Sequence, residues 1–188
     1  ADGCDAVFMF ASSGTALVGL GRARRRSRWR PALHVVQGAG AAPIAAPLDP
    51  RPAPPGRRVG SLGARKTRRL GEAVRLVRAS GGAGWVIGDE EADAAAALLR
   101  AEGIPAALEA AAALAAAGRA ARAGAVRSAV VVVSGRERPA PAASAVAAAD
   151  AACHRPASAA DALAIFDRLR AAGPPYATDT PKTSDAHP

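Results

Sequence analysis

The chain has 188 residues, half of them hydrophobic but only 3% aromatic, and a formal net charge of +9. This length suits one ordinary domain, and no apolar run approaches the roughly 18 residues that a membrane-spanning helix needs. The positive charge is concentrated between Arg22 and Arg69, where thirteen Lys or Arg accompany a single acidic residue, Asp49.

The first half of the chain alternates between apolar and helical patterns. Residues 6–10 (AVFMF) predict a short buried strand, and the small residues ASSGT lead into a helix from Thr15 to about residue 26. LHVVQ at 33–37 predicts a second strand, which a Pro/Gly-rich irregular stretch follows. Two further elements are predicted, a helix and a third strand, at residues 70–79 and 85–87.

The second half contains the strongest helix signal, GDEEADAAAALLRAEG, with Asp89 as the expected N-cap. Pro105 is expected in the first turn of a second helix that ends at Gly118. The apolar run AVVVV, residues 129–133, predicts a central strand of a parallel sheet. Two C-terminal segments are predicted, an amphipathic helix and a polar disordered tail, at residues 158–172 and 174–188.

Strands separated by helices, with no hairpin signals, predict an α/β fold with a mainly parallel sheet and flanking helices. We expect an α/β region at residues 1–136, a helical segment at 137–173 and a tail at 174–188. Ligands of such folds bind beyond the carboxyl ends of the strands. The loops ASSGT and SGRE, which follow the first and the valine-rich strand, are therefore the candidate site.

The remaining chemistry-bearing residues form no motif. Cys4 and Cys153 are far apart in sequence, which favours two reduced thiols in a cytoplasmic protein and no metal site. The chain begins without Met, and Asp2 and Asp5 precede its first apolar run, so we expect a piece of a longer or processed chain without a signal peptide. Neither a dinucleotide fingerprint, a P-loop nor a nucleophile elbow is present.

The order of the elements is more informative than any single loop. GCDAVFMFASSGTALVGLGRARR followed by LHVVQGAGAAP resembles a stretch of the fold type II, tryptophan synthase β-like, pyridoxal-phosphate enzymes. The segment from ASGGAGWVIGDEE through AEGIPAALEA to VVVVSG is similar to a later stretch of the same family. The resemblance covers roughly residues 3–136, the second half of such an enzyme. It is closest to threonine synthases, with cysteine synthases and threonine or serine dehydratases behind.

The resemblance implies pyridoxal 5'-phosphate as cofactor and an amino acid as substrate, in β- or γ-replacement or elimination chemistry of the lyase type. It implies that the cofactor phosphate is held by backbone and hydroxyl groups of Ser12, Ser13, Gly14 and Thr15. Ser134 is implied to lie at the pyridine nitrogen, where a hydroxyl leaves that nitrogen largely unprotonated.

The chain also departs from the family pattern. The loop ASSGT carries less glycine than the family's phosphate loop, and Ala107, Leu108 and Glu109 replace an acidic-Pro-Ser run. The family's Schiff-base lysine and its asparagine-containing substrate loop belong to an upstream part, and neither Lys66 nor Lys182 matches that motif. We therefore expect no catalytic residue in this chain, which would act only when the other half completes it.

Two alternatives stay open. The chain could be a non-catalytic α/β module that binds an anionic partner through residues 22–30 (RARRRSRWR), although the scarcity of aromatics and lysines disfavours nucleic acid. It could also fail to fold stably alone, because half a sheet leaves an exposed edge. A homodimer is compatible with the sequence, and no membrane partner is expected.

Overall fold

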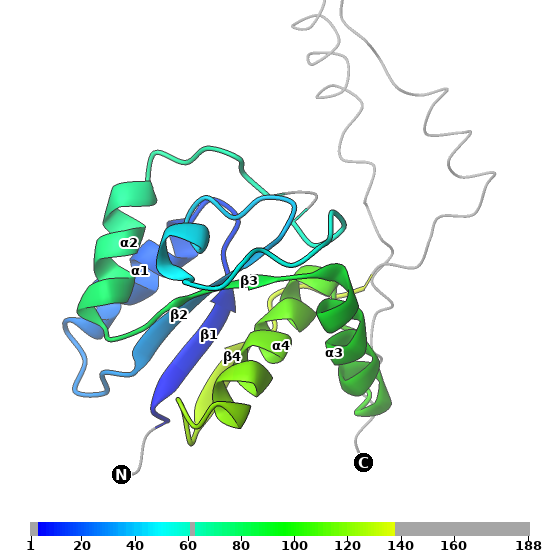
Figure 1. Ribbon diagram of the computed structural model, residues 1–188. Coiled ribbons are helices and arrows are strands. Elements are labelled where there is room, and N and C mark those ends of the chain that lie inside the picture. The colour runs from blue at the N-terminus through cyan, green and yellow to red at the C-terminus, as the bar shows by residue number, and fades with distance from the viewer. Residues whose placement is uncertain (1–3, 61–62, 138–188) are drawn as a thin grey trace, which may run out of the picture. The chain divides into compact units, whose positions relative to one another are not determined.

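The computed structural model describes residues 4–60 and 63–137, which form a parallel sheet with helices on both faces (Figure 1). The strands are β1 (Ala6–Phe10), β2 (Ala32–Gly38), β3 (Gly84–Ile87) and β4 (Ala129–Val132). They lie in the order β3-β2-β1-β4, and every neighbouring pair is parallel. The predicted α/β class is confirmed.

Helices connect the strands and cover both faces of the sheet. They are α1 (Thr15–Arg24), α2 (Leu70–Ala79), α3 (Asp89–Ala101) and α4 (Leu108–Arg122), with a short 3-10 helix η1 (Ala46–Leu48) after β2. Figure 1 shows α1 and α2 together on one face and α4, with α3 beside it, on the other. Such a layered arrangement leaves the carboxyl ends of the strands open along one edge.

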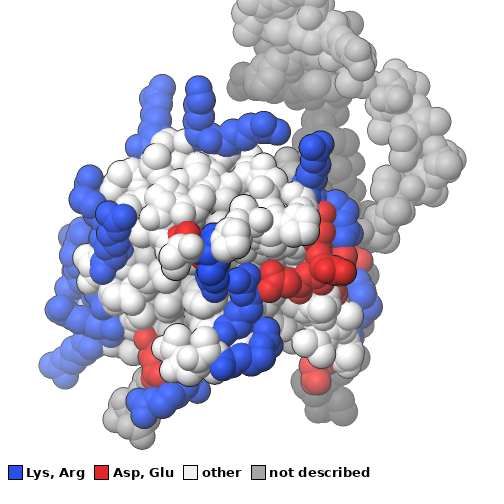
Figure 2. Space-filling view, viewed as in Figure 1, with Lys and Arg blue, Asp and Glu red and all other residues white. Residues whose placement is uncertain are grey.

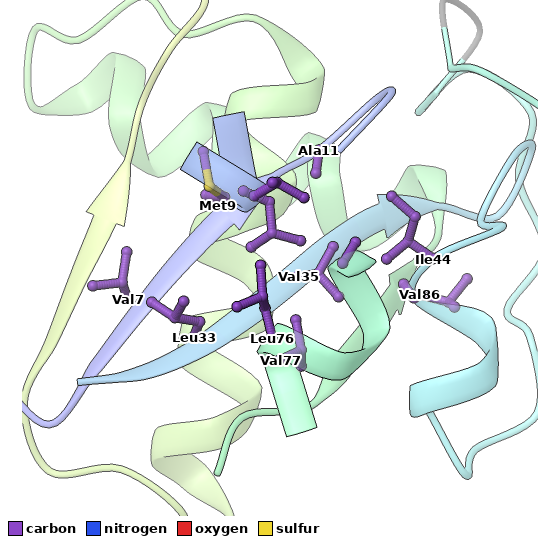
Figure 3. Close-up of a cluster of buried hydrophobic side chains, with 13 residues drawn as sticks. Val7, Met9, Ala11, Leu33, Val35, Ile44, Leu76, Val77 and Val86 are labelled. Carbon is purple, nitrogen blue, oxygen red and sulfur yellow. The ribbon is translucent and has the colours of Figure 1, made fainter. Parts of the chain in front are cut away.

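The core follows from the alternation of side chains along the strands. On one face Val7, Met9 and Val35 pack against Leu76 and Val77 of α2, as Figure 3 shows. On the other face, larger strand side chains meet the alanine-rich surface of α4, whose small residues let the helix approach the sheet closely. These strand residues are Phe8, Val36, Trp85 and Ile87.

Most predicted elements are confirmed, and two of them, β1 and α2, have the expected bounds. Three predictions are wrong. In the sheet that the structure describes, β4 is an edge strand rather than a central one. The second helix begins at Leu108 and continues through Gly118 to Arg122, because Ala116, Ala117 and Ala120 pack against the sheet. Residues 105–107 instead hold Ala106 in a short bridge with Arg136.

Asp89 is the third correction, since it does not cap its helix. The N-cap of α3 is Gly88, and no side chain bonds there. The Asp89 carboxylate accepts the backbone N–H groups of residues 57–59 at 3.0–3.2 Å. Its pKa is lowered to about 2, most strongly by the N–H of Val59.

Several expectations lie outside the described residues, among them the helix at 158–172, the tail at 174–188, Cys153 and Lys182. Among the helices that the structure does describe, none has the length and apolar character needed to cross a bilayer.

Candidate functional site

The two predicted site loops lie on neighbouring strands at the same edge of the sheet. β1 and β4 pair in register, with Met9 opposite Val132. Because the strands are parallel, the turn at residues 11–14 and Ser134 both leave the sheet at its carboxyl edge. The structure thus brings Gly14 and Ser134 to one edge, where α/β folds hold their ligands.

The turn after β1 presents the start of a helix. Gly14 is the N-cap of α1, with φ of 82°, and no side chain caps the helix. A Cβ at this position would lie 2.8 Å from Ile44 Cδ1, so that side chain would have to shift, and the positive φ itself favours glycine. The first N–H groups of a helix have no intrahelical acceptor. Since Ser13 and Thr15 are exposed beside them, the turn can hold an anion.

Gln37 fixes the position of this turn, and our sequence analysis missed it. Its side chain is buried at the end of β2, and its Nε2 donates to Ala11 O at 2.7 Å and to Ser12 O at 3.3 Å. Its Oε1 accepts the N–H groups of Ile44 and Ala45, each at 2.8 Å. The one signal for it in the sequence is a polar amide that closes the predicted strand LHVVQ.

A second support comes from residues 63–69, which pass along the outside of the turn. The N–H of Ala64 donates to Ser12 Oγ at 3.3 Å, and Thr67 Oγ1 donates to Ser13 O at 2.6 Å. Arg69 Nε donates to Thr15 Oγ1 at 3.2 Å. The last contact places a guanidinium beside the start of α1, where it can neutralise part of the charge of a bound anion.

Ser134 lies in a more open setting. It is exposed and lines a cavity of about 550 Å³ with Ile104, Val133 and Arg136. The segment is held to the loop before α4, since the N–H of Ala107 donates to Gly135 O at 2.9 Å. The hydroxyl of Ser134 has no hydrogen bond within the described part of the chain, so it is free to meet a ligand.

Lys and Arg side chains lie at both ends of the sheet, and some of them bond to other parts of the fold. Figure 2 shows Lys and Arg side chains along the top of the molecule, over the segment that leads into α2 in Figure 1. At the opposite end, Arg22 forms an ion pair with Glu72 at 2.7 Å. Arg24 donates to the carbonyl groups of Arg30, Pro31 and Ser80. Part of the run at residues 22–30 therefore holds the fold together.

His34 is a structural residue in the described core. It is 6% exposed and stacks on Phe8, with ring centroids 4.3 Å apart. Its Nδ1 accepts the N–H of Ala83 and the indole N–H of Trp85. Burial lowers the pKa of His34 to about 4, so the ring is neutral at pH 7. Within the described residues, no group of three or more His, Cys, Asp or Glu could hold a metal ion.

Comparison with solved structures shows the fold. A threonine deaminase from T.th. superposes with a TM-score of 0.56 at 18% identity, covering 74% of this chain and 48% of that one. A variant of O-ureido-L-serine synthase bound to O-ureido-L-serine gives 0.54 at 17% identity, covering 79% and 48%. The chain thus spans about half the length of these proteins. No curated protein sequence matches it.

Comparison with models of protein families shows which family the chain belongs to. The model for the family described as "Pyridoxal-phosphate dependent enzyme" matches residues 2–135, which include the turn after β1, Gln37 and Ser134. The match covers well over half of the chain and agrees with the parallel sheet and its flanking helices. This chain belongs to the pyridoxal-phosphate dependent enzyme family.

Proposed function

We propose that this chain is the phosphate- and ring-binding half of an enzyme that carries out β- or γ-replacement or elimination on an amino acid, with threonine synthase as the nearest type. The observation that carries the proposal is the register of β1 and β4. It sets Ser134 and the turn at residues 11–14 side by side at one sheet edge, as a phosphorylated pyridine ring requires.

The residues present fit the group. An elongated ligand with a phosphate at one end needs an anion site and, one strand away, a partner for its ring nitrogen. The uncapped start of α1 and the exposed hydroxyls of Ser13 and Thr15 supply the anion site, and Arg69 adds positive charge. When bound, pyridoxal phosphate supplies an electron sink for a substrate carbanion.

The hydroxyl of Ser134 sets the protonation of the ring nitrogen in this proposal. A neutral hydroxyl can donate its proton to the nitrogen in a hydrogen bond, whereas a carboxylate there would stabilise a protonated ring. An unprotonated ring withdraws electrons less strongly, which suits replacement and elimination. Lys66, the one lysine among the described residues, is exposed in the segment leading to α2, and we assign it no covalent role.

Binding of a ligand without the aldehyde tests the phosphate site, because it cannot react with lysine. Titration calorimetry of the full chain should show that pyridoxine 5'-phosphate binds at least about tenfold more tightly than pyridoxine, since hydrogen bonds to a charged group contribute about 1.5–3 kcal/mol. Ser13→Ala with Thr15→Val should reduce that difference, while Ser27→Ala, at the other end of the sheet, should not. Equal affinity for both ligands would refute the proposal.

The ring site has a matched pair of serines. Ser134 follows β4 at the carboxyl edge and Ser128 precedes it at the opposite edge, and both are exposed. In Ser134→Asp we expect the ring nitrogen of bound pyridoxine 5'-phosphate to titrate at higher pH, as seen in its ultraviolet spectrum. Ser128→Asp should leave the titration unchanged. If the two variants behave alike, Ser134 does not contact the ring.

The alternative function keeps one supporting observation. Arg25, Arg26 and Arg28 are exposed, and their side chains have no ion pair or hydrogen bond in the described part of the chain. They could bind a polyanion such as nucleic acid without any cofactor. Salt-sensitive binding of heparin that is lost in the triple variant Arg25→Ala, Arg26→Ala and Arg28→Ala, together with no pyridoxine 5'-phosphate binding, would favour this alternative.

A further inference from the structure

A short basic segment, residues 63–69 (GARKTRR), borders the proposed phosphate site from outside. It carries four Lys or Arg and no acidic residue. Figure 2 shows Lys and Arg, and no acidic side chains, along the top of the molecule, where Figure 1 shows the segment that leads into α2. The proposed function uses one of these four cations, Arg69, which bonds to Thr15. The other three have no role in it.

The segment is held beside the turn after β1 in a fixed register. The N–H of Ala64 donates to Ser12 Oγ at 3.3 Å, and Thr67 Oγ1 donates to Ser13 O at 2.6 Å. Thr67 Oγ1 also accepts the N–H of Arg69, the N-cap residue of α2, at 3.1 Å. These bonds fix the positions of the residues between them relative to the turn.

The three remaining cations, Arg65, Lys66 and Arg68, alternate with the bonded residues and are exposed. Their side chains have no hydrogen bond or ion pair within the described part of the chain. Each is next to Ala64 or Thr67 in the chain, and consecutive Cα atoms lie about 3.8 Å apart, so its charged group lies within roughly 15 Å of the turn. Three positive charges are therefore kept close to the proposed phosphate site without touching it.

Most carboxylates at the neighbouring start of α3 are already neutralised, so they do not offset these charges. Three of the four acidic residues there are paired with arginines, namely Asp89, Glu91 and Asp93. The unpaired cations of residues 63–69 therefore produce a positive potential in front of the turn. Such a potential attracts an anion before any contact forms.

We propose that Arg65, Lys66 and Arg68 form an electrostatic guide that speeds the arrival of phosphate-bearing ligands at the turn after β1. The inference rests on the proposed function and adds a kinetic role beside it. Because their charges act over a distance, the three side chains raise the association rate constant, kon, and leave the dissociation rate constant, koff, nearly unchanged. Arg69 differs, since its guanidinium lies at the site and contributes to the bound state.

Screening by salt sets the size of the expected effect. The Debye length is about 30 Å at 10 mM salt, about 10 Å at 100 mM and about 3 Å at 1 M. Charges within roughly 15 Å of the turn therefore act strongly at 10 mM and hardly at all at 1 M. Steering by a whole charged surface raises association rates by about 10- to 1000-fold, so we expect three charges to contribute roughly fivefold at about 100 mM.

Stopped-flow binding of pyridoxine 5'-phosphate to the full chain tests the inference, with the fluorescence of the ligand as the signal. In the triple variant Arg65→Gln, Lys66→Gln and Arg68→Gln, kon should fall roughly fivefold at about 100 mM salt, while koff stays within about twofold. The difference from the unaltered chain should grow at about 10 mM salt and disappear at about 1 M. Pyridoxine, which has no phosphate, should bind to both chains at the same rate.

The chain offers a matched control at the other end of the sheet. Arg25, Arg26 and Arg28 are also exposed and unpaired within the described residues. They follow α1, whose 10 residues separate them from the turn by about 15 Å or more. Changing all three to Gln removes the same net charge, so kon should stay within about twofold at about 100 mM salt. A loss as large as in the first triple variant would overturn the inference, because overall charge would then be the cause.

A charge-conserving variant separates guidance from direct contact. Arg65→Lys with Arg68→Lys keeps both positive charges but not the planar guanidinium groups, so kon and its salt dependence should be retained. All these variants change exposed, unpaired side chains, and they should keep the urea midpoint of the unaltered chain. If the Lys variant loses as much kon as the Gln variant, or if the Gln variant raises koff instead, the side chains contact the ligand and the inference is wrong.

The outcomes also separate this inference from the proposed function. If pyridoxine 5'-phosphate does not bind to the full chain, the proposed function fails and the inference fails with it. If pyridoxine 5'-phosphate binds with the same kon to the unaltered chain and to the Gln variant at about 10 mM salt, the phosphate site stands and the guide is refuted.

Discussion

The most demanding test of the site's architecture is the replacement of Gln37. In Gln37→Leu the shape of the side chain is roughly kept, but four hydrogen bonds to the backbone are lost. The N–H groups of Ile44 and Ala45 then have no acceptor, and both residues are 0% exposed. Leaving a buried donor unsatisfied costs about 1–3 kcal/mol, so the two together predict a destabilisation of about 2–6 kcal/mol.

That loss is a large part of the roughly 5–15 kcal/mol that stabilises a typical domain. Urea denaturation of the full chain, read from the midpoint at constant slope, gives the change in unfolding free energy directly. Pyridoxine 5'-phosphate affinity should fall as well under conditions where the variant is folded, because the carbonyls of Ala11 and Ser12 are no longer held. A Gln37→Leu variant within about 0.5 kcal/mol of the unaltered chain would refute this reasoning.

Gln37→Glu supplies the control, because it keeps the acceptor and loses the donor. One carboxylate oxygen can still accept the N–H groups of Ile44 and Ala45, while the other faces Ala11 O, which Nε2 approaches to 2.7 Å in the native chain. Protonation restores a donor at that oxygen, so the pKa of the new carboxyl is raised by folding. The destabilisation relative to the unaltered chain at the same pH should therefore shrink as the pH falls toward 4.

Three further predictions concern the frame around the site. Folding lowers the pKa of His34 from 6.5 to about 4, so the neutral ring stabilises the folded chain fully above pH 6.5. As the pH falls toward 4 the folded chain should lose up to about 3 kcal/mol of its unfolding free energy. Urea denaturation should show this decrease between pH 6.5 and 4, and His34→Asn should abolish it. Asp89→Asn should accelerate amide exchange at residues 57–59, whose N–H groups the carboxylate accepts, and unchanged exchange would show that the carboxylate does not hold this segment. Gly14→Ala should cost at least about 1–2 kcal/mol in thermal or urea unfolding, since alanine disfavours a φ of 82° and its Cβ would crowd Ile44; a neutral effect would contradict the turn geometry.

Local patterns were sufficient to predict most of the elements and to place the two candidate loops at one edge of the sheet. The bounds of β1 and α2 follow from apolar periodicity. The edge of the candidate site follows from the parallel arrangement, because the carboxyl ends of parallel strands lie at the same edge of the sheet in any strand order. The lateral order itself is not encoded locally. The run AVVVV is as apolar as a central strand, yet β4 lies at the edge, with Val130 38% and Val133 39% exposed.

The contacts that the sequence could not predict are those between distant segments. Asp89 has every local feature of an N-cap, but backbone N–H groups some 30 positions earlier reach its carboxylate. Gly118 has the local features of a helix end, but the packing of Ala120 on the sheet carries α4 past it. In both cases a tertiary contact outweighs a local preference of about 1 kcal/mol.

The two halves of the site differ in how firmly the chain holds them, and this affects what each can contribute. The turn after β1 is fixed from two directions, by Gln37 from the neighbouring strand and by residues 63–69 from outside. Ser134 follows an edge strand and is fixed mainly through Gly135 and the short bridge at Ala106. A phosphate site gains affinity from fixed donors, because ordering them on binding costs free energy.

Ser134, which we propose as the partner of the ring nitrogen, needs by contrast a definite orientation, and the segment after the edge strand provides it less firmly. We therefore expect substitutions around Gln37 to change affinity for any phosphorylated ligand. Substitutions around Ser134 should instead change the protonation and tilt of the ring at nearly constant affinity. A variant such as Ala107→Pro, which removes the N–H that donates to Gly135 O, should broaden the ring's pH titration while the Kd of pyridoxine 5'-phosphate stays within about threefold, a difference below about 1 kcal/mol. A large loss of affinity in this variant would show that both ends of the ligand depend on one rigid unit.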